Sequence, residues 1–352
     1  MKESWLSSSS IFMSREDAVC KINEYAVSVT PFLLVSDFEG KHSAVLTMAE
    51  AEMHGIRFRM HHQGLGIRDW GLGIQDPGYG MRDAGSGITA RPFSFEASPV
   101  DFETYRHAFE KVSWHLKRGD TYLINLTFPT EIRTDLGLQE IFERSSAPFK
   151  LLFSDHFVVF SPEPFISIEG GFVSSFPMKG TIDAAIPDAE ARLLADEKEY
   201  FEHNTIVDLI RNDISMIATE VKVERFRYIE KISTSRKTLL QMSSEVRGRM
   251  PGGYLSHLGD AIFRLLPAGS VSGAPKEKTV QIIRETEPVD RGFYTGIFGY
   301  FDGRDFSSAV MIRFIENADG RLRYRSGGGI TALSDCRSEY QELIDKVYVP
   351  LV

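Results

Sequence analysis

The sequence predicts one large α+β domain, on the strength of three observations. Its 352 residues are 42% hydrophobic and 25% charged, which is a globular composition with enough apolar side chains for a sizeable core. Segments with strand-like and helix-like periodicity follow one another without the strict alternation of a parallel α/β sheet. No stretch rich in proline, serine or charge divides the chain, so a single unit is expected.

The first part of the chain predicts a strand, a short second element and an amphipathic helix. Residues 32–40 (FLLVSDFEG) have the apolar character of a strand, and residues 43–52 form the short element. A helix is expected over residues 101–120 and should end at Gly119. Four apolar residues recur there at helical spacing on one face: Tyr105, Phe109, Val112 and Leu116.

Strands dominate the centre of the chain, and a long helical run follows them. Residues 121–132 (TYLINLTFPTEI) alternate as a strand does, and residues 149–181 predict successive strands joined by turns. A helix is expected from about residue 188 to residue 218. The second half of the chain repeats this mixture of strands and helices.

Residues 64–91 are a seven-residue repeat in four copies, each of which opens Gly-x-Gly. Two glycines per heptad would cost a helix about 2 kcal/mol per repeat, which disfavours a coiled coil. The spacing also differs from that of calcium-binding nonapeptide repeats. The segment is expected to be an expanded surface loop between two early strands. This is favoured over a ligand site built from its aspartates, Asp69, Asp76 and Asp83.

Charge and cysteine content restrict the partners and the compartment. The formal net charge of −9 argues against nucleic acid or an anionic membrane as the main partner, but leaves room for a small anionic ligand. Cys20 and Cys336 lie far apart and form no CxxC pair, so neither a disulfide framework nor a zinc site is expected. A reducing, cytoplasmic location fits, because the first residues contain no apolar run long enough for a signal peptide or membrane helix.

Two glycine-rich stretches suggest nucleotide sites but do not meet their requirements. Residues 327–332 (GGGITA) fit a loose dinucleotide fingerprint, yet no convincing βαβ unit surrounds them. Residues 269–276 (GSVSGAPK) resemble a phosphate loop but lack its Gly-Lys-Ser/Thr ending, and Pro275 removes a backbone donor. Both stretches remain candidates for loops whose backbone N–H groups approach a small anion.

Two helix-like segments each carry a pair of glutamates three residues apart. Glu199 and Glu202 share one helix face, as do Glu339 and Glu342, and Lys346 extends the second face. Taken singly, each pair is more typical of a solvated helix surface. If the two helices face each other, the carboxylate oxygens together with water suit octahedral Mg²⁺.

Lys179 lies in an unusually constrained frame, within SSFPMKGTID (174–183). Pro177 precedes it by two residues and Gly180 follows it directly, where lysine more often has polar neighbours. Such a backbone could hold an amine in a pocket, although a turn with an exposed lysine is the simpler interpretation of this stretch alone.

Nine motifs between about residues 115 and 350 resemble those of the chorismate-utilising enzymes, which include anthranilate, aminodeoxychorismate, isochorismate and salicylate synthases. They are GDTYLINLT, SPEPF, PMKGT, EHNTIVDLIRND, LLPAGSVSGAPK, RGFYTGIFGY, IRF, GGGITALSD and EYQELIDK, in that order. The resemblance implies two packed antiparallel sheets with outer helices, as in anthranilate synthase component I. Residues 101–352 are expected to form the chorismate-binding catalytic region. Residues 1–100, which match less well, are expected to be a divergent N-terminal part that carries the repeat.

The resemblance also implies roles for individual residues. Mg²⁺ would link the ring carboxylate of chorismate to Glu202 and Glu342, with Glu199 and Glu339 acting largely through water. His203, beside Glu202, is expected to be a packed residue rather than a ligand. The implied substrate-binding positions are Thr181, Ser270, Tyr294, Arg313, Gly327, Gly328, Gly329 and Lys346.

Lys179 directs the comparison to one branch of the family. Most members carry alanine at this position, whereas lysine is typical of aminodeoxychorismate synthase component I. There the lysine adds to C2 of chorismate and expels the C4 hydroxyl, and ammonia then adds at C4 and expels the lysine. The lysine must be neutral to attack, and its apolar frame near Mg²⁺ is expected to depress its pKa. Glu163 of SPEPF matches the family's general acid, against the alternative of an exposed loop glutamate.

Two departures bear on the reaction. Where the family has a histidine associated with elimination, this chain has Gln241, which cannot exchange a proton near neutral pH. This disfavours an aromatising enzyme. Leu123 stands where isochorismate and salicylate synthases carry a water-activating lysine and where amine-using members commonly have glutamine. Water is therefore disfavoured as the nucleophile, and the ammonia pocket is expected to differ.

The expected function is amination of chorismate to 4-amino-4-deoxychorismate, the precursor of p-aminobenzoate and folate. Ammonia would come from a separate glutamine amidotransferase, because no nucleophilic cysteine with a partner histidine stands in a suitable context. Two alternatives remain: anthranilate synthase component I with an atypical Lys179, and a non-catalytic chorismate-binding homologue.

Overall fold

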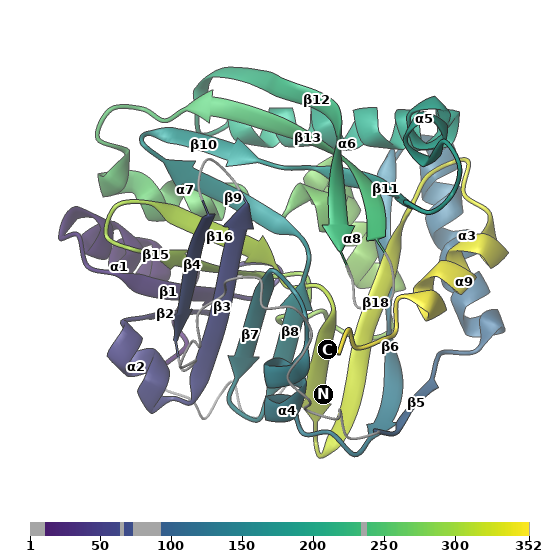
Figure 1. The fold of residues 1–352 in the computed structure, drawn as a ribbon, viewed down its shortest axis with the longest axis horizontal. Helices are drawn as coiled ribbons and strands as arrows, with labels where there is room; N and C mark the ends of the chain where they lie inside the picture. The colour runs from purple at the N-terminus through teal and green to yellow at the C-terminus, as the bar shows by residue number, and fades with distance from the viewer. Residues whose placement is uncertain (1–10, 64–66, 73–92, 234–237, 352) are drawn as a thin grey trace.

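The computed structural model describes residues 11–63, 67–72, 93–233 and 238–351, and these form two antiparallel β-sheets with helices around them (Figure 1). Apolar side chains from both sheets meet in a shared core. Phe58 of one sheet, for example, contacts Tyr300 of the other with ring centroids 5.3 Å apart. The expected fold class is confirmed.

The first sheet has nine strands, and its far end contributes one wall of the site described below. In spatial order it contains β11 (Met178–Asp183), β13 (Thr238–Arg249), β10 (Phe172–Ser175), β9 (Pro164–Glu169), β16 (Phe306–Val310), β15 (Ile297–Phe301), β1 (Phe32–Ser36) and β2 (Ser43–Leu46), while β12 (Thr219–Ser233) pairs with β13.

The second sheet also has nine strands. In spatial order it contains β14 (Gly273–Ala274), β6 (Leu123–Thr134), β18 (Arg321–Ile330), β17 (Phe314–Ala318), β8 (Phe157–Ser161), β7 (Phe149–Phe153), β3 (Ile56–Gln63) and β4 (Ile67–Leu72), while β5 (Phe95–Ser98) pairs with β6. The strands that precede residue 100 belong to both sheets, so this part of the chain is built into the same unit as the rest.

Helices cover the outside of the sheets. They are α1 (Arg15–Val27), α2 (Met48–Met53), α3 (Phe102–Arg118), α4 (Leu138–Arg144), α5 (Ala189–Ala195), α6 (Glu197–Ser215), α7 (Leu258–Arg264), α8 (Lys276–Thr286) and α9 (Cys336–Asp345), with short 3₁₀ turns η1 (Tyr254–His257) and η2 (Gly269–Val271). The α3 helix was expected: Asp101 caps its start, and Gly119 ends it in the left-handed conformation at φ 78°.

The single helix expected over residues 188–218 is two helices. Asp196 breaks the run with extended backbone at φ −69° and ψ 114°, and its carboxylate accepts a hydrogen bond from the Glu199 N–H at 3.0 Å. The break lets α5 pack against β11 and β13, while α6 packs against these strands and also against β12. The sequence signal for this break was therefore Asp196, an N-cap residue within an otherwise helical pattern.

The glycine repeat is only partly a loop. Residues 67–72 form β4, which pairs with β3 in antiparallel register from Gln63↔Ile67 to Phe58↔Leu72. The loop prediction is wrong for these six positions, because the backbone continues the sheet there. The other repeat positions, including Asp76 and Asp83, lie outside the described residues.

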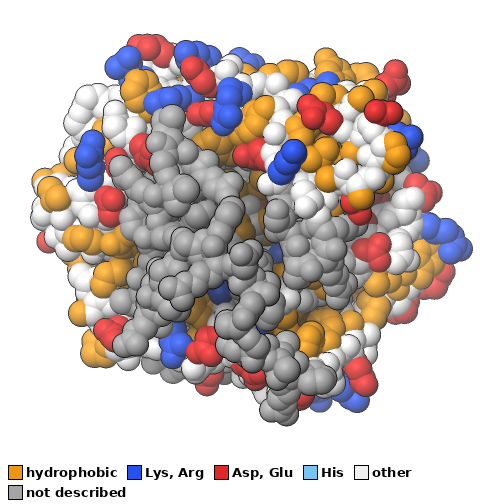
Figure 2. Space-filling model, viewed as in Figure 1, with side chains coloured by type: hydrophobic (Ala, Val, Ile, Leu, Met, Phe, Trp, Pro, Cys, Tyr) orange, Lys and Arg blue, Asp and Glu red, His pale blue; other side chains and the backbone are white. Residues whose placement is uncertain are grey.

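Side chains of both charges share the face of the molecule seen in Figure 2. On the described part of the face in Figure 2, acidic and basic side chains are interspersed. Within the ranges that the structure describes, no helix combines the length and the apolar character needed to cross a bilayer.

Candidate active site

A cavity of about 430 Å³ lies where β11, β13 and α6 on one side approach β6, β18 and α9 on the other. It is lined by every residue that the sequence marked for the site, with the exception of Gly328. A side chain at Gly328 would nonetheless stand 3.5 Å from a carboxylate oxygen of Glu339 and 3.7 Å from the Lys346 Nζ. Segments from most of the chain thus converge on one space.

A β-bulge explains the frame around Lys179. The register of β11 on β13 shifts between Lys179 and Thr181, and Gly180 between them has φ 76°. A Cβ at Gly180 would lie 3.0 Å from Leu193 Cδ1 and 3.1 Å from Glu199 Oε2. Only glycine therefore suits this position, on grounds of both conformation and space. The bulge presents Lys179 to the cavity, with its Nζ 2.6 Å from Glu202 Oε2.

A depressed Lys179 pKa is expected beside bound Mg²⁺, whereas the protein groups alone act in the other direction. Burial disfavours the ammonium ion and lowers the pKa, but the nearby carboxylate charges, led by that of Glu202, outweigh burial and raise the pKa above 10.5. The frame is apolar, as its sequence indicated, yet the carboxylates come from a helix far away in the chain. Lys179 is therefore a paired ammonium ion here.

The two glutamate pairs do face a common space. Glu199 and Glu202 reach it from α6, and Glu339 and Glu342 reach it from α9. Within the described residues, no three His, Cys, Asp or Glu side chains are grouped closely enough to hold a metal ion by themselves. The hard oxygens of carboxylates on opposite walls still suit a divalent cation whose remaining ligands are water or substrate.

Lys346 completes the α9 side of the cavity. Its Nζ lies 2.6 Å from Glu342 Oε1 and donates a hydrogen bond of 2.8 Å to the Gly327 carbonyl. Burial lowers the pKa of Lys346 more than the carboxylate of Glu342 raises it. The close approach of β18 to β6 requires glycine at 327, since a Cβ there would stand 2.6 Å from the Leu126 carbonyl oxygen.

Glu163 lies in the cavity wall between two prolines, not on an exposed loop. Its N–H donates to Ser161 Oγ at 3.1 Å and its carbonyl accepts from the Val310 N–H at 3.1 Å, so the backbone is fixed. Ser270 Oγ donates to its carboxylate at 2.5 Å. Burial raises the Glu163 pKa above 4.5, although Ser270 and neighbouring cations oppose the rise. This is the state that a general acid needs.

Tyr294 and Arg313 add polar groups to the same cavity. Arg313 has a left-handed backbone at φ 52°, which is costly for a residue other than glycine, asparagine or aspartate and is often found at functional sites. Burial raises the pKa of Tyr294 to about 12, so its hydroxyl remains a donor. With Arg313, Lys179 and Lys346 all close enough to lower the Glu163 pKa, the cavity suits an anionic ligand.

The structure also locates residues outside the predicted set. Asn125 and Thr295 line the cavity. An amide side chain in the mostly apolar strand 123–128 was the available signal for Asn125. Leu123 lines the cavity too and brings no donor, while the Oε1 of Gln241 is buried there without a hydrogen-bond partner. His203 is packed as expected: it is buried, and its Nε2 lies 2.6 Å from Ser244 Oγ.

Comparisons with known proteins agree with this geometry. The sequence pattern of a family described as "chorismate binding enzyme" matches residues 86–352. An uncharacterised PabA-like protein of Pasteurella multocida is 45% identical over 339 residues, covering 96% of this chain and 100% of that protein.

A relative with a named function and one with a solved structure are less similar to this chain. Aminodeoxychorismate synthase component 1 of Salmonella typhimurium is 33% identical over 259 residues, which cover 69% of this chain and 56% of that protein. The structure of the menaquinone-specific isochorismate synthase of Escherichia coli superposes with a TM-score of 0.61, covering 96% of this chain and 91% of that one at 16% identity, and so supports the fold. From its sequence pattern, its relatives and its two-sheet fold, the chain belongs to the chorismate-binding enzyme family.

Proposed function

We propose that the chain is the chorismate-aminating component of an aminodeoxychorismate synthase and converts chorismate and ammonia to 4-amino-4-deoxychorismate. One observation carries the proposal: Lys179, a potential nucleophile, shares a cavity with Glu163, a buried carboxyl with a raised pKa. Ammonia would come from a glutamine amidotransferase subunit, and the product would supply p-aminobenzoate and folate synthesis.

The proposed reaction replaces the C4 hydroxyl in two allylic displacements. The Lys179 amine bonds to ring carbon C2, both ring double bonds shift, and the C4–O bond breaks. Ammonia then bonds to C4, the double bonds shift back, and the C2–N bond to Lys179 breaks. Each displacement releases one proton from the attacking nitrogen. The departing hydroxyl takes one to leave as water, and the departing Lys179 nitrogen takes the other to leave as the free amine.

Two carboxyl groups supply the proton transfers. Lys179 attacks as a free amine, and Glu202 Oε2, 2.6 Å from Nζ, can accept the proton that must leave first. Once Glu202 has taken the proton, it carries no charge and no longer raises the lysine pKa, so the amine stays free for attack. Glu163, protonated and held by Ser270, gives its proton to the C4 hydroxyl.

The cations and donors of the cavity orient the dianionic substrate. Arg313, Tyr294 and Lys346 are proposed to hold its carboxylates, with Thr181, Ser270 and the glycines 327–329 forming the rest of the cradle. Mg²⁺ would be held by Glu202 and Glu342, with Glu199 and Glu339 acting through water, and would accept charge developing on the ring carboxylate.

The decisive experiment identifies the product. Purified chain with chorismate, Mg²⁺ and ammonium is expected to form 4-amino-4-deoxychorismate, which retains its enolpyruvyl group even after long incubation. Gln241 cannot carry the proton that elimination requires, and attack at C2 by Lys179 directs ammonia to C4. Gln241→His is expected to form no anthranilate, because Lys179 still sets the regiochemistry. Anthranilate as the main wild-type product would refute the proposal, and chorismate binding without turnover would indicate a non-catalytic homologue.

The proposed cation site is tested by replacing one glutamate on each helix. Glu202→Gln and Glu342→Gln are each expected to weaken Mg²⁺ binding at least about tenfold, because a neutral amide is a poorer ligand for a hard cation. Calorimetric titration with chorismate present measures this separately from turnover. Matched controls are Glu197→Gln on α6 and Asp345→Asn on α9, which are exposed and outside the cavity. Unchanged Mg²⁺ affinity in either cavity variant would place that helix away from the cation.

A further inference from the structure

Arg291 is a buried arginine behind the cavity wall, and it is not one of the residues that line the cavity. All five of its guanidinium N–H donors are used. Glu287 accepts two of them, at 2.9 and 2.7 Å, and the pair is almost fully buried. The other three go to the Val271 carbonyl at 2.6 Å, the Asn125 carbonyl at 2.7 Å and Thr295 Oγ1 at 3.3 Å.

The three remaining acceptors all belong to the cavity wall. Val271 follows Ser270, whose hydroxyl holds Glu163. Asn125 lines the cavity from β6, and Thr295 follows Tyr294. Glu287 also accepts from the Thr127 N–H at 2.9 Å, which ties β6 to the same ion pair. One guanidinium therefore joins three wall segments that lie far apart in the sequence.

The turn between β1 and β2, residues 37–42, supports the guanidinium from the other side. The Phe38 ring lies 4.5 Å from the Arg291 guanidinium carbon, and the Phe38 N–H donates to the Gly292 carbonyl at 2.8 Å. Phe38 is 4% exposed, so its ring closes off the guanidinium from solvent.

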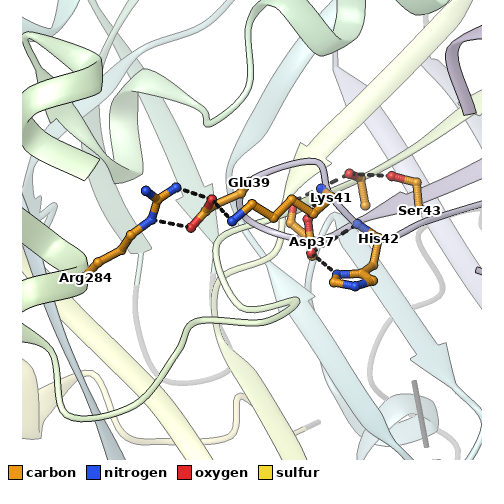
Figure 3. Close-up of polar contacts among 7 residues, drawn as sticks. Asp37, Glu39, Lys41, His42, Ser43 and Arg284 are labelled. Carbon is orange, nitrogen blue, oxygen red and sulfur yellow. Dashed lines mark hydrogen bonds and ion pairs between the residues drawn. The ribbon is translucent and has the colours of Figure 1, made fainter. Parts of the chain in front are cut away.

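Charged side chains fasten this turn to α8 (Figure 3). Arg284 of α8 donates to both carboxylate oxygens of Glu39, and the Lys41 Nζ lies 2.6 Å from the same carboxylate. Asp37 accepts from the Lys41 N–H at 2.7 Å and pairs with His42 Nδ1 at 2.8 Å. Arg284 precedes Glu287 by three residues, so α8 is linked to the turn and to the arginine together.

We propose that Arg291, backed by Phe38, is a positioning residue that holds Ser270 against Glu163 and keeps Asn125 and Tyr294 in place. The inference rests on the proposed function for its kinetic consequences only, because the contacts themselves do not depend on the reaction. Arg291 reaches no substrate atom, and its effect passes through the wall segments that it joins.

Arg291→Lys is the direct test, since one ammonium group cannot reach the acceptors that a guanidinium joins. We expect kcat to fall about 10- to 100-fold while KM for chorismate rises by a smaller factor, because Tyr294 and Ser270 shift but Arg313 and Lys346 are untouched. We also expect the alkaline limb of the pH–rate profile to move to higher pH. The hydrogen bond from Ser270 lowers the Glu163 pKa, so its loss would let burial raise this pKa further. The charged groups that also lower the Glu163 pKa are Arg313, Lys346 and Lys179.

Phe38→Leu is the milder second variant, which retains apolar volume but removes the aromatic face. It is expected to lower kcat and to move the alkaline limb to higher pH, both by less than Arg291→Lys does. It keeps the inference testable if Arg291→Lys fails to fold. The matched control is Lys150→Met. Lys150 is also a buried cation that donates to carbonyls, those of Phe142 and Ser145, but it lies outside the cavity wall. Even if Lys150→Met lowers Tm, its kcat and the alkaline limb of its pH–rate profile should match those of wild type.

Hydrogen exchange separates this inference from the proposed function. Peptides spanning residues 121–127 and 268–274 are expected to exchange faster in Arg291→Lys and Phe38→Leu but not in Lys150→Met, and no turnover is needed for this measurement. If wild type does not aminate chorismate, the proposed function fails and exchange alone decides the inference. Unchanged exchange, or an unchanged kcat and pH limb in an active enzyme, would overturn it.

Discussion

Lys179→Ala is expected to lower the rate of chorismate amination by more than about 1,000-fold while the protein remains folded. The side chain ends in a cavity and contributes little packing, so the fold should survive its removal, although loss of the ion pair with Glu202 is expected to lower Tm. Steady-state formation of 4-amino-4-deoxychorismate, followed by mass, measures the effect. During turnover the wild-type enzyme should also carry a substrate adduct on the peptide that contains Lys179.

Lys179→Arg is the matched control for charge. Arginine preserves a cation opposite Glu202, which lies 2.6 Å from the lysine amine, but it cannot be deprotonated in a protein and so cannot act as the nucleophile. Both variants should therefore be equally inactive. Full activity in Lys179→Ala would show that Lys179 is not the covalent nucleophile. Activity in Lys179→Arg but not in Lys179→Ala would show that the lysine acts only through its positive charge.

Local sequence patterns predicted much of the fold because their signals lie within short segments. The α3 helix shows an apolar face, an Asp101 cap and a Gly119 stop, and all three are found in the structure. The division at Asp196 was missed because helix-forming residues flank it and only one hydrogen bond, to the Glu199 N–H, marks the new start. Strand β4 was missed because the glycines of the repeat around it disfavour regular structure, while pairing with β3 overrides that preference.

The candidate site residues could be named from sequence motifs, but the electrostatics of the cavity that they line could not. Lys179, Glu163 and the two glutamate pairs were marked by family motifs, and all of them line one cavity. The pKa of Lys179 depends on the distance to Glu202, which no local pattern contains, and at 2.6 Å this carboxylate raises the pKa. Arg291 was missed for a similar reason, because its contacts with the Asn125 and Val271 carbonyls join it to segments 166 and 20 residues away.

Glu163→Gln is expected to lower kcat by about 10²- to 10⁴-fold, since glutamine retains the shape of glutamate but has no acidic proton to give. Wild-type activity should fall on the alkaline side as Glu163 loses its proton, at a pH above the ordinary value of 4.5 because burial raises this pKa. The residual activity of Glu163→Gln should lack that limb. Glu163→Asp keeps an acidic group but shortens the reach to Ser270, so intermediate activity with the limb retained is expected.

Thermal stability provides the second measurement on Glu163→Gln. At high pH the substitution is expected to lower activity but not Tm. Because the folded-state pKa is raised, the stability that the protonated carboxyl contributes is complete below pH 4.5 and is lost as the pH rises through the folded pKa. Glutamine does not ionise, so the variant should have a Tm equal to or above that of wild type near about pH 8, and this advantage should vanish below pH 4.5. A variant that is both inactive and less stable at the higher pH would mean that the ionised carboxylate is structural. Full activity in a stable Glu163→Gln would remove Glu163 as the general acid.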